Sequence, residues 1–193
     1  MIHVYFIRHG QTQWNVEKRL QGRTDIQLNE AGRLQIAAYQ LPECLLSVPW
    51  FTSPLLRAQQ TVELLGVDAN TEGALIEMSW GDWEGKALAQ LRQQDPVYVA
   101  EQESLGLDLR PVGGESPRLV AKRVSAWIET LDIANVEQRI GCVSHKGIIR
   151  AIYASATNWD MLGKPPHKLN FHCAQHFCFD SGCWFIGELN IPL

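Results

Sequence analysis

The feature that most constrains the fold of this chain is the alternation of short apolar runs with segments of helical periodicity. The runs at 3–7, 48–52, 74–78 and 139–145 are short and rich in β-forming residues, which predicts buried strands. Strands that alternate with helices are typical of a mostly parallel sheet covered by helices on both faces. We therefore expect an α/β protein, a three-layer α/β/α sandwich.

The expected helices begin at residues that favour helix starts. Asn29 is a candidate N-cap for a helix over 28–41. In the next helix, over 53–65, Ser53 serves as a cap and Pro54 occupies the first helical position. The other helices are expected at 86–94, from Ser116-Pro117 onward, and at 147–157. In the long helix that begins at Ser116-Pro117, one apolar face is formed by Leu119, Val120, Val124, Trp127, Ile128 and Leu131.

Two segments depart from this alternation. The stretch 79–115 holds Trp80 and Trp83 and an Asp95-Pro96 break, and it predicts a cap inserted into a single domain that spans residues 1–193. The C-terminal stretch 171–189 predicts a β-hairpin with Ser181-Gly182 at its turn.

Composition excludes several functional classes. The chain has 193 residues and a net charge of -4, and it has no basic run, which argues against a nucleic-acid surface. We find neither a signal-peptide pattern nor an apolar run of about 18 residues, so no membrane association is expected. Five scattered Cys favour a reducing compartment, and we expect a cytoplasmic protein. The sequence does not indicate an oligomeric state.

Reactive side chains gather at three predicted strand ends. The first strand runs into Arg8-His9-Gly10, the second is followed by Arg57, and the third ends at His145. Ligands of such sheets bind beyond the carboxyl ends of the strands. Two Arg, two His and nearby helix N-termini on one rim predict a site for a dianion, with phosphate the best match to the flat guanidinium group.

Several motifs in order carry a resemblance to a known family. They are "FIRHGQTQWN" (6–15), "LQGRTDIQLNEAG" (20–32), "SPLLRAQQT" (53–61), "EMSWGDWEG" (77–85), "GGES" (113–116) and "VSHKGIIRA" (143–151). Together they resemble the histidine phosphatase superfamily, the phosphoglycerate mutase-like proteins. The match extends over most of the chain, from residue 3 to residue 151.

The resemblance implies a role for each matching residue. His9 would be the nucleophile that accepts the phosphoryl group, and Glu77 would be the proton donor to the leaving alcohol. The phosphate would be surrounded by Arg8, Arg57 and His145. Further phosphate or substrate contacts are implied for Thr12, Asn15, Gln21, Gly22 and Lys146. No metal and no cofactor are expected, because arginines supply the positive charge that phosphoryl transfer requires.

Some assignments remain open at this point. Glu84 lies near Glu77 in the sequence and is the alternative proton donor. Lys146 stands where the family often has Gly, and its side chain has two alternatives, the site or solvent. Trp80 and Trp83 are interpreted as packing residues. The cluster of His and Cys at 172–183 is not interpreted as a zinc site, because neighbouring residues on strands face opposite ways.

The short insert favours a phosphatase over a mutase. In mutases of this family a larger insert holds a substrate carboxylate with paired arginines, whereas Arg92 and Arg110 stand alone here. The chain is thus similar to short bacterial members, the broad-specificity phosphatases and the alpha-ribazole phosphatases. The expected partner is a small phosphorylated substrate or inorganic phosphate. The alternatives are mutase-type phosphoryl transfer and a catalytically silent phosphate-binding module, and the natural substrate stays open.

Overall fold

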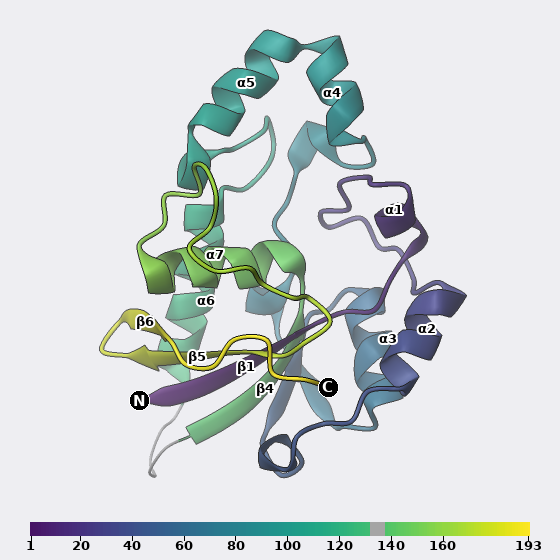
Figure 1. The fold of residues 1–193 in the computed structure, drawn as a ribbon, viewed down its shortest axis with the longest axis vertical. Coiled ribbons are helices and arrows are strands. Elements are labelled where there is room, and N and C mark those ends of the chain that lie inside the picture. The colour runs from purple at the N-terminus through teal and green to yellow at the C-terminus, as the bar shows by residue number, and fades with distance from the viewer. Residues whose placement is uncertain (132–137) are drawn as a thin grey trace.

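The protein is built on a mixed sheet of six strands in the order β3-β2-β4-β1-β5-β6 (Figure 1). We describe residues 1–131 and 138–193 of a computed structural model. The strands are β1 (Ile2–Arg8), β2 (Trp50–Thr52), β3 (Ala69–Thr71), β4 (Gln138–Ser144), β5 (Gln175–Asp180) and β6 (Cys183–Ile186). The pairs β2–β3, β2–β4 and β1–β4 are parallel, whereas β1–β5 and β5–β6 are antiparallel. The expected α/β class with a mostly parallel sheet is confirmed.

Helices cover both faces of this sheet (Figure 1). They are α1 (Gln13–Val16), α2 (Glu30–Ala37), α3 (Leu56–Leu65), α4 (Leu88–Gln94), α5 (Pro96–Ser104), α6 (Pro117–Thr130) and α7 (Lys146–Thr157). Short 3-10 turns are η1 (Glu43–Leu45), η2 (Gly73–Leu75), η3 (Gly81–Trp83) and η4 (Gly106–Asp108). The predicted caps Asn29 and Ser116 accept hydrogen bonds from the N–H groups of Gly32 and Leu119. No helix in the described ranges is both long and apolar enough to cross a membrane.

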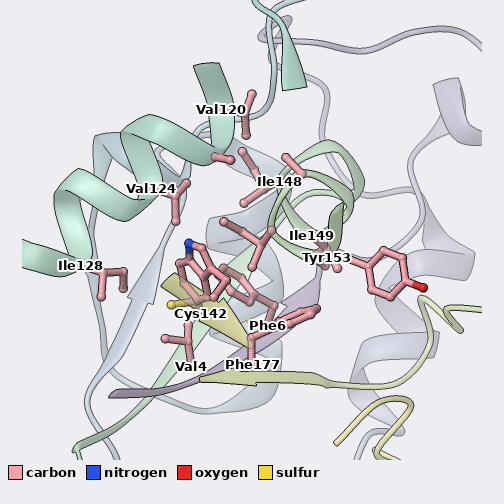
Figure 2. Close-up of a cluster of buried hydrophobic side chains, with 14 of the residues drawn as sticks. Val4, Phe6, Val120, Val124, Ile128, Cys142, Ile148, Ile149, Tyr153 and Phe177 are labelled. Atoms are coloured by element: carbon pink, nitrogen blue, oxygen red, sulfur yellow. The ribbon is translucent and has the colours of Figure 1, made fainter. Parts of the chain in front are cut away.

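The larger hydrophobic core lies between the sheet and helices α6 and α7 (Figure 2). It is formed from alternate residues of the central strands and the apolar faces of the two helices, including Val4, Phe6, Val120, Val124, Ile128, Cys142, Ile148, Ile149, Tyr153 and Phe177. A smaller cluster on the opposite face contains Tyr5, Ile7, Val143 and the α3 residues Ala58 and Val62. Leu119, expected on the apolar face of α6, is 39% exposed, whereas Val120, Val124, Trp127 and Ile128 of that face are buried.

The strand expected at 74–78 and the helix start expected at Ser53 are wrong. The run at 74–78 is not a strand: the edge strand β3 comes earlier, at Ala69–Thr71, and residues 73–75 form a 3-10 turn. Leu75 and Met78 are nevertheless buried against the main core, because an apolar run signals burial and not a particular backbone shape. Helix α3 begins at Leu56 and not at Ser53, whose hydroxyl accepts a hydrogen bond from Leu55 N–H instead.

The segment predicted as a cap contains η3, α4, α5 and η4, and Figure 1 shows α4 and α5 at the top of the view, beyond the sheet. A separate small cluster of Trp83, Leu91 and Val99 holds it together. The Asp95-Pro96 break divides two helices, since Asp95 caps α5 and Pro96 occupies its first turn. The C-terminal hairpin is confirmed: β5 and β6 pair around Ser181 and Gly182.

Candidate active site

The carboxyl ends of three strands meet at one rim of the sheet. Arg8 pairs with Ser144 in register, and the N–H of His9 donates to the Ser144 carbonyl at 3.0 Å. The N–H of Ser53 donates to the Val143 carbonyl at 3.1 Å, which brings the end of β2 to the same place. A cavity of about 840 Å³ opens at this rim. Its size is within the range of small-molecule sites.

The His9 ring is held in one tautomer. Its Nδ1 donates to the Gly10 carbonyl at 2.7 Å, so the proton is on Nδ1 and Nε2 carries a free lone pair. The ring is 5% exposed and lines the cavity. Burial, with the charges of Arg8 and Arg57 as further causes, holds the pKa of His9 well below 6.5. His9 is therefore a neutral imidazole with its lone pair available to an electrophile.

Gly10 follows this histidine where another part of the chain approaches closely. A Cβ at Gly10 would lie 2.8 Å from both the Gly32 carbonyl oxygen and a side-chain carbon of Ile36. Helix α2 therefore packs directly against the chain after β1, and only glycine fits there.

Arg8 directs a positive charge into the cavity. Its side chain lines the cavity, and its Nε is buried without a hydrogen-bond partner among the residues that the structure describes. The guanidinium lies over the ring of Phe171 at 5.8 Å. A buried N–H donor without a partner is costly, so this group is suited to an anion that completes its hydrogen bonding.

Arg57 is fully buried and ties the site to the loop after α1. Its Nη1 donates to the Thr24 carbonyl at 2.9 Å and its Nη2 to the Gly22 carbonyl at 2.7 Å. Arg57 lines the cavity as well. Burial lowers its pKa and Glu77 is the largest opposing influence, so this charge is partly compensated by the carboxylate across the site.

His145 contacts Arg57 and does not itself line the cavity. Arg57 Nε donates to His145 Nδ1 at 3.3 Å. The proton is thus on Nε2, which faces the Ser53 hydroxyl at 2.7 Å. Burial, followed by Arg57, His9 and Arg8, holds the pKa of His145 well below 6.5. In this structure His145 positions Arg57, while its ring centroid lies 5.1 Å from that of His9.

Glu77 lines the cavity and is 8% exposed. Its Oε1 accepts the N–H of Met78 at 2.8 Å, and its Oε2 accepts the N–H of Gly147 at 3.2 Å. Burial raises the pKa of Glu77, although the two N–H groups and the arginines oppose this. A Cβ at Gly147 would come within 2.4 Å of Glu77 Oε1, so glycine is needed for α7 to approach the carboxylate.

Glu84, the alternative proton donor, has a different position. Its carboxylate accepts hydrogen bonds from two loops. The donors are Arg23 N, Thr24 N and Thr24 Oγ1 in one loop, and Ser79 Oγ and Trp80 N in the other. Gly22 packs against it with a φ of +52°, and a Cβ there would lie 2.0 Å from Glu84 Oε1. Glu84 joins two loops, whereas Glu77 faces the cavity.

We expect Glu84→Ala to destabilise the protein by about 3 kcal/mol, because several backbone donors lose a charged acceptor at once. Glu77→Ala, which removes fewer such contacts, should destabilise it less. Urea unfolding of both variants checks this. Equal free energies of unfolding for Glu84→Ala and the wild type would contradict the structural role of Glu84.

The loop around α1 places the remaining predicted contacts. Asn15 and Gln21 line the cavity, as does Gly22. Thr12 does not: it is fully buried, caps α1, and donates to Gln21 Oε1 at 3.0 Å and to Asn15 Oδ1 at 3.2 Å. Thr12 thus orients two cavity residues from behind.

Helix α7 contributes two cations to the cavity. Lys146, at its first residue, lines the cavity and places its Nζ 5.4 Å from the centre of the Phe171 ring. Arg150, one turn later, lines the cavity too and lies over the Trp159 ring at 5.4 Å. Sequence reasoning missed Arg150, although the i, i+4 spacing from Lys146 indicates one helix face. It also missed Phe171, which has no local signal.

Glu115 and two arginines stabilise the segment that carries Glu77. Arg123 contacts Glu115 at 2.8 Å and donates to the carbonyls of Ala74 and Ile76. Arg23 donates to the Glu77 carbonyl at 3.3 Å and also reaches Glu115. These hydrogen bonds, and not pairing with a neighbouring strand, hold the segment 74–78 in place.

The two isolated arginines of the 79–115 segment have internal partners. Arg92 pairs with Glu103, and Arg110 donates to the Gly114 carbonyl at 3.0 Å. In the ranges that the structure describes, one group of side chains has metal-ligand proximity, His3, His176 and Cys178, and none of the three lines the cavity.

The chain is similar in sequence to known phosphatases and a mutase. The adenosylcobalamin/alpha-ribazole phosphatase of Escherichia coli is 29% identical over 194 residues, which cover 97% of this chain and 90% of that protein. The glucosyl-3-phosphoglycerate phosphatase of Mycobacterium tuberculosis is 31% identical over 207 residues, which cover 95% and 92%. A 2,3-bisphosphoglycerate-dependent phosphoglycerate mutase of Gloeobacter violaceus is 32% identical over 156 residues, with coverages of 76% and 71%.

Solved structures show the same fold. The structure of a mycobacterial glucosyl-3-phosphoglycerate phosphatase complexed with VO3 superposes with a TM-score of 0.79 at 29% identity, and 98% of each chain is covered. The model of the histidine phosphatase superfamily (branch 1) matches residues 4–192. The chain therefore belongs to the histidine phosphatase superfamily, branch 1.

Proposed function

We propose that this protein is a phosphomonoesterase that works through a phosphohistidine intermediate on His9, with Glu77 as general acid and base. The observation that carries the proposal is the state of His9. Its Nδ1 proton is committed to the Gly10 carbonyl, so Nε2 keeps a free lone pair, and His9 lines a cavity that Arg8 and Arg57 also line. A nucleophile beside an electropositive pocket is the arrangement that phosphoryl transfer needs.

In the first step His9 Nε2 attacks phosphorus while the bond from phosphorus to the alcohol oxygen breaks. Arg8 and Arg57 neutralise the equatorial oxygens, with Asn15 as a further donor. Glu77 gives its proton to the departing oxygen, so the alcohol leaves neutral and Glu77 becomes a carboxylate. The Gly10 carbonyl stabilises the positive charge of the phosphorylated ring through the Nδ1 proton.

In the second step water attacks phosphorus and the P–N bond breaks. The Glu77 carboxylate takes the proton of that water, which restores the acid for the next cycle. The products are phosphate and neutral His9. Lys146 and Arg150 lie on the α7 side of the cavity and Trp14 and Trp80 also line it, so the leaving group meets both cationic and apolar surface.

The pH dependence of kcat follows from the two pKa shifts. The pKa of His9 is lowered from 6.5, so the nucleophile stays neutral on the acid side. The pKa of Glu77 is raised from 4.5, and a bound dianion raises it further. As pH rises through the Glu77 pKa, the acid is lost and the alcohol-release step slows. We expect kcat for an alkyl phosphate to be higher near pH 5–6 than near pH 8, measured by phosphate release. A kcat that rises steadily with pH through neutrality would contradict this.

The proposal is tested by phosphate release from p-nitrophenyl phosphate and a panel of natural phosphate monoesters with EDTA present. We expect release that EDTA does not reduce, since the arginines provide the positive charge. Conversion of 3-phosphoglycerate to 2-phosphoglycerate without release of phosphate would favour a mutase. Binding of phosphate with no turnover of any ester would favour a silent phosphate-binding module. Either result would reject the phosphatase proposal.

A further inference from the structure

A second group of reactive side chains lies at the opposite end of the central strands. His3 of β1 pairs directly with Cys178 of β5, and Tyr5 pairs with His176. Residues two apart on a strand share a face, so His3, His176 and Cys178 project from the same face of the sheet. Six residues of extended chain separate His3 from His9, which places this cluster about 20 Å from the cavity.

The three ligand atoms form a compact triangle. His3 Nδ1 lies 2.9 Å from His176 Nε2, and Cys178 Sγ lies 3.6 Å from each of these nitrogens. Zinc bonds of about 2.0–2.1 Å to nitrogen and about 2.3 Å to sulfur put neighbouring tetrahedral ligands about 3.3–3.6 Å apart. The two sulfur distances match this spacing, and the nitrogen pair needs a ring movement of about 0.4 Å.

We propose that His3, His176 and Cys178 bind a divalent zinc ion. Two imidazoles and one thiolate are a ligand set that zinc favours, and the fourth position would be taken by water. All three side chains are half-buried, so an ion can enter from solvent. The thiol proton is released to solvent when sulfur binds the metal.

The neighbours of His176 hold its ring in place. The ring stacks on Tyr5 with centroids 4.3 Å apart, and Gly187 leaves room for it, since a Cβ there would come within 2.2 Å of His176 Nδ1. The N–H of Glu188 faces His176 Nδ1 at 3.3 Å, so the ring proton is on Nε2 in the metal-free protein. Metal binding moves this proton to Nδ1 and turns the Glu188 N–H toward water, which reduces the affinity.

Charged side chains of both signs lie around the cluster. Arg139 of β4 lies beside His3 of β1 in the sheet, so its guanidinium adds a positive charge near the cluster. The Glu188 carboxylate acts on Tyr5 in the opposite sense to Arg139. Because Arg139 is exposed and repels a cation, we expect Arg139→Gln to tighten zinc binding about threefold.

The other histidines and cysteines of the C-terminal segment lie elsewhere. His172 contacts Gln35, and Cys173 contacts Asn170. Cys183 is exposed at the start of β6. The sequence analysis did not interpret the residues at 172–183 as a zinc site, and it did not consider His3, which β1 brings beside His176 and Cys178 of β5.

The experiment is a titration of the EDTA-treated, full-length protein with Co²⁺, which replaces zinc and gives a thiolate-to-metal absorption band. We expect a band that saturates at one equivalent and is reversed by zinc. Cys178→Ser should abolish the band, and His3→Ala or His176→Ala should weaken binding at least tenfold. Cys183→Ser and His9→Ala should bind like the wild type, and Arg139→Gln should bind more tightly.

Phosphate release from p-nitrophenyl phosphate in EDTA verifies that the Cys178→Ser and His3→Ala proteins are folded. A Co²⁺ band that persists in Cys178→Ser, or that disappears in His9→Ala, would overturn the proposal. So would the absence of a band in the folded wild type. The gain expected for Arg139→Gln is a second check, because damage to the fold would not increase affinity.

Discussion

Replacing His9 with alanine should lower kcat for p-nitrophenyl phosphate by about 10³-fold or more, because the nucleophile is lost and water must attack phosphorus directly. Binding of phosphate should persist, since Arg8 and Arg57 remain. The measurement is steady-state phosphate release together with competition by inorganic phosphate.

His172→Ala is the matched control for this change. His172 also lines the cavity but is exposed and contacts Gln35, so its removal should leave kcat within about threefold of the wild type. Circular dichroism and thermal unfolding of both variants show whether the fold is retained. Substantial turnover by a folded His9→Ala protein would mean that another group attacks phosphorus.

Replacing Glu77 with glutamine should separate the two chemical steps. p-Nitrophenolate leaves without a proton, so the first step stays fast, whereas hydrolysis of the phosphohistidine loses its general base. We expect a burst of about one nitrophenolate per active site, followed by a steady-state rate reduced by about 10²–10⁴-fold. An alkyl phosphate should give no burst, because its alcohol needs the Glu77 proton to leave. Stopped-flow absorbance follows both phases.

Glu103→Gln is the control for this variant, since Glu103 lines the cavity yet pairs with Arg92. It should give no burst and a rate near that of the wild type. If Glu77→Gln turned over p-nitrophenyl phosphate at the wild-type steady-state rate, Glu77 would not be the base. If Glu77→Gln kept the wild-type rate and Glu84→Gln gave the burst, Glu84 would be the general base.

Local patterns predicted most of the fold. Asn29 and Ser116 cap their helices as expected, because the hydroxyl or amide of a cap bonds to its own first turn and depends little on the rest of the chain. The hairpin at Ser181-Gly182 likewise depends on residues close together in the sequence. No strand forms at 74–78, because Leu75 and Met78 are buried in the main core between the sheet and helices α6 and α7 without pairing in the sheet.

The sequence predicted which residues form the candidate site better than it predicted where each of them lies. The rim that joins Arg8, His9 and Arg57 follows from strand ends that meet in a parallel sheet, whereas Glu77 reaches the rim from a segment that is not a strand. The positions of Thr12 and His145 behind the wall depend on tertiary contacts, with Gln21 and with Arg57. Phe171 reaches the cavity from beyond the last quoted motif, whereas Arg150 lies inside that motif (143–151), where the resemblance implied no role for it.

The most direct test of the central claim is to isolate the phosphorylated enzyme. The wild-type protein and Glu77→Gln are mixed with substrate and quenched in alkali, which preserves phosphohistidine, and the peptides are analysed by mass spectrometry. We predict one phosphoryl group on the peptide that contains His9, lost on acid treatment and more abundant in Glu77→Gln. A phosphoryl group on another residue, or none during turnover, would contradict catalysis through His9.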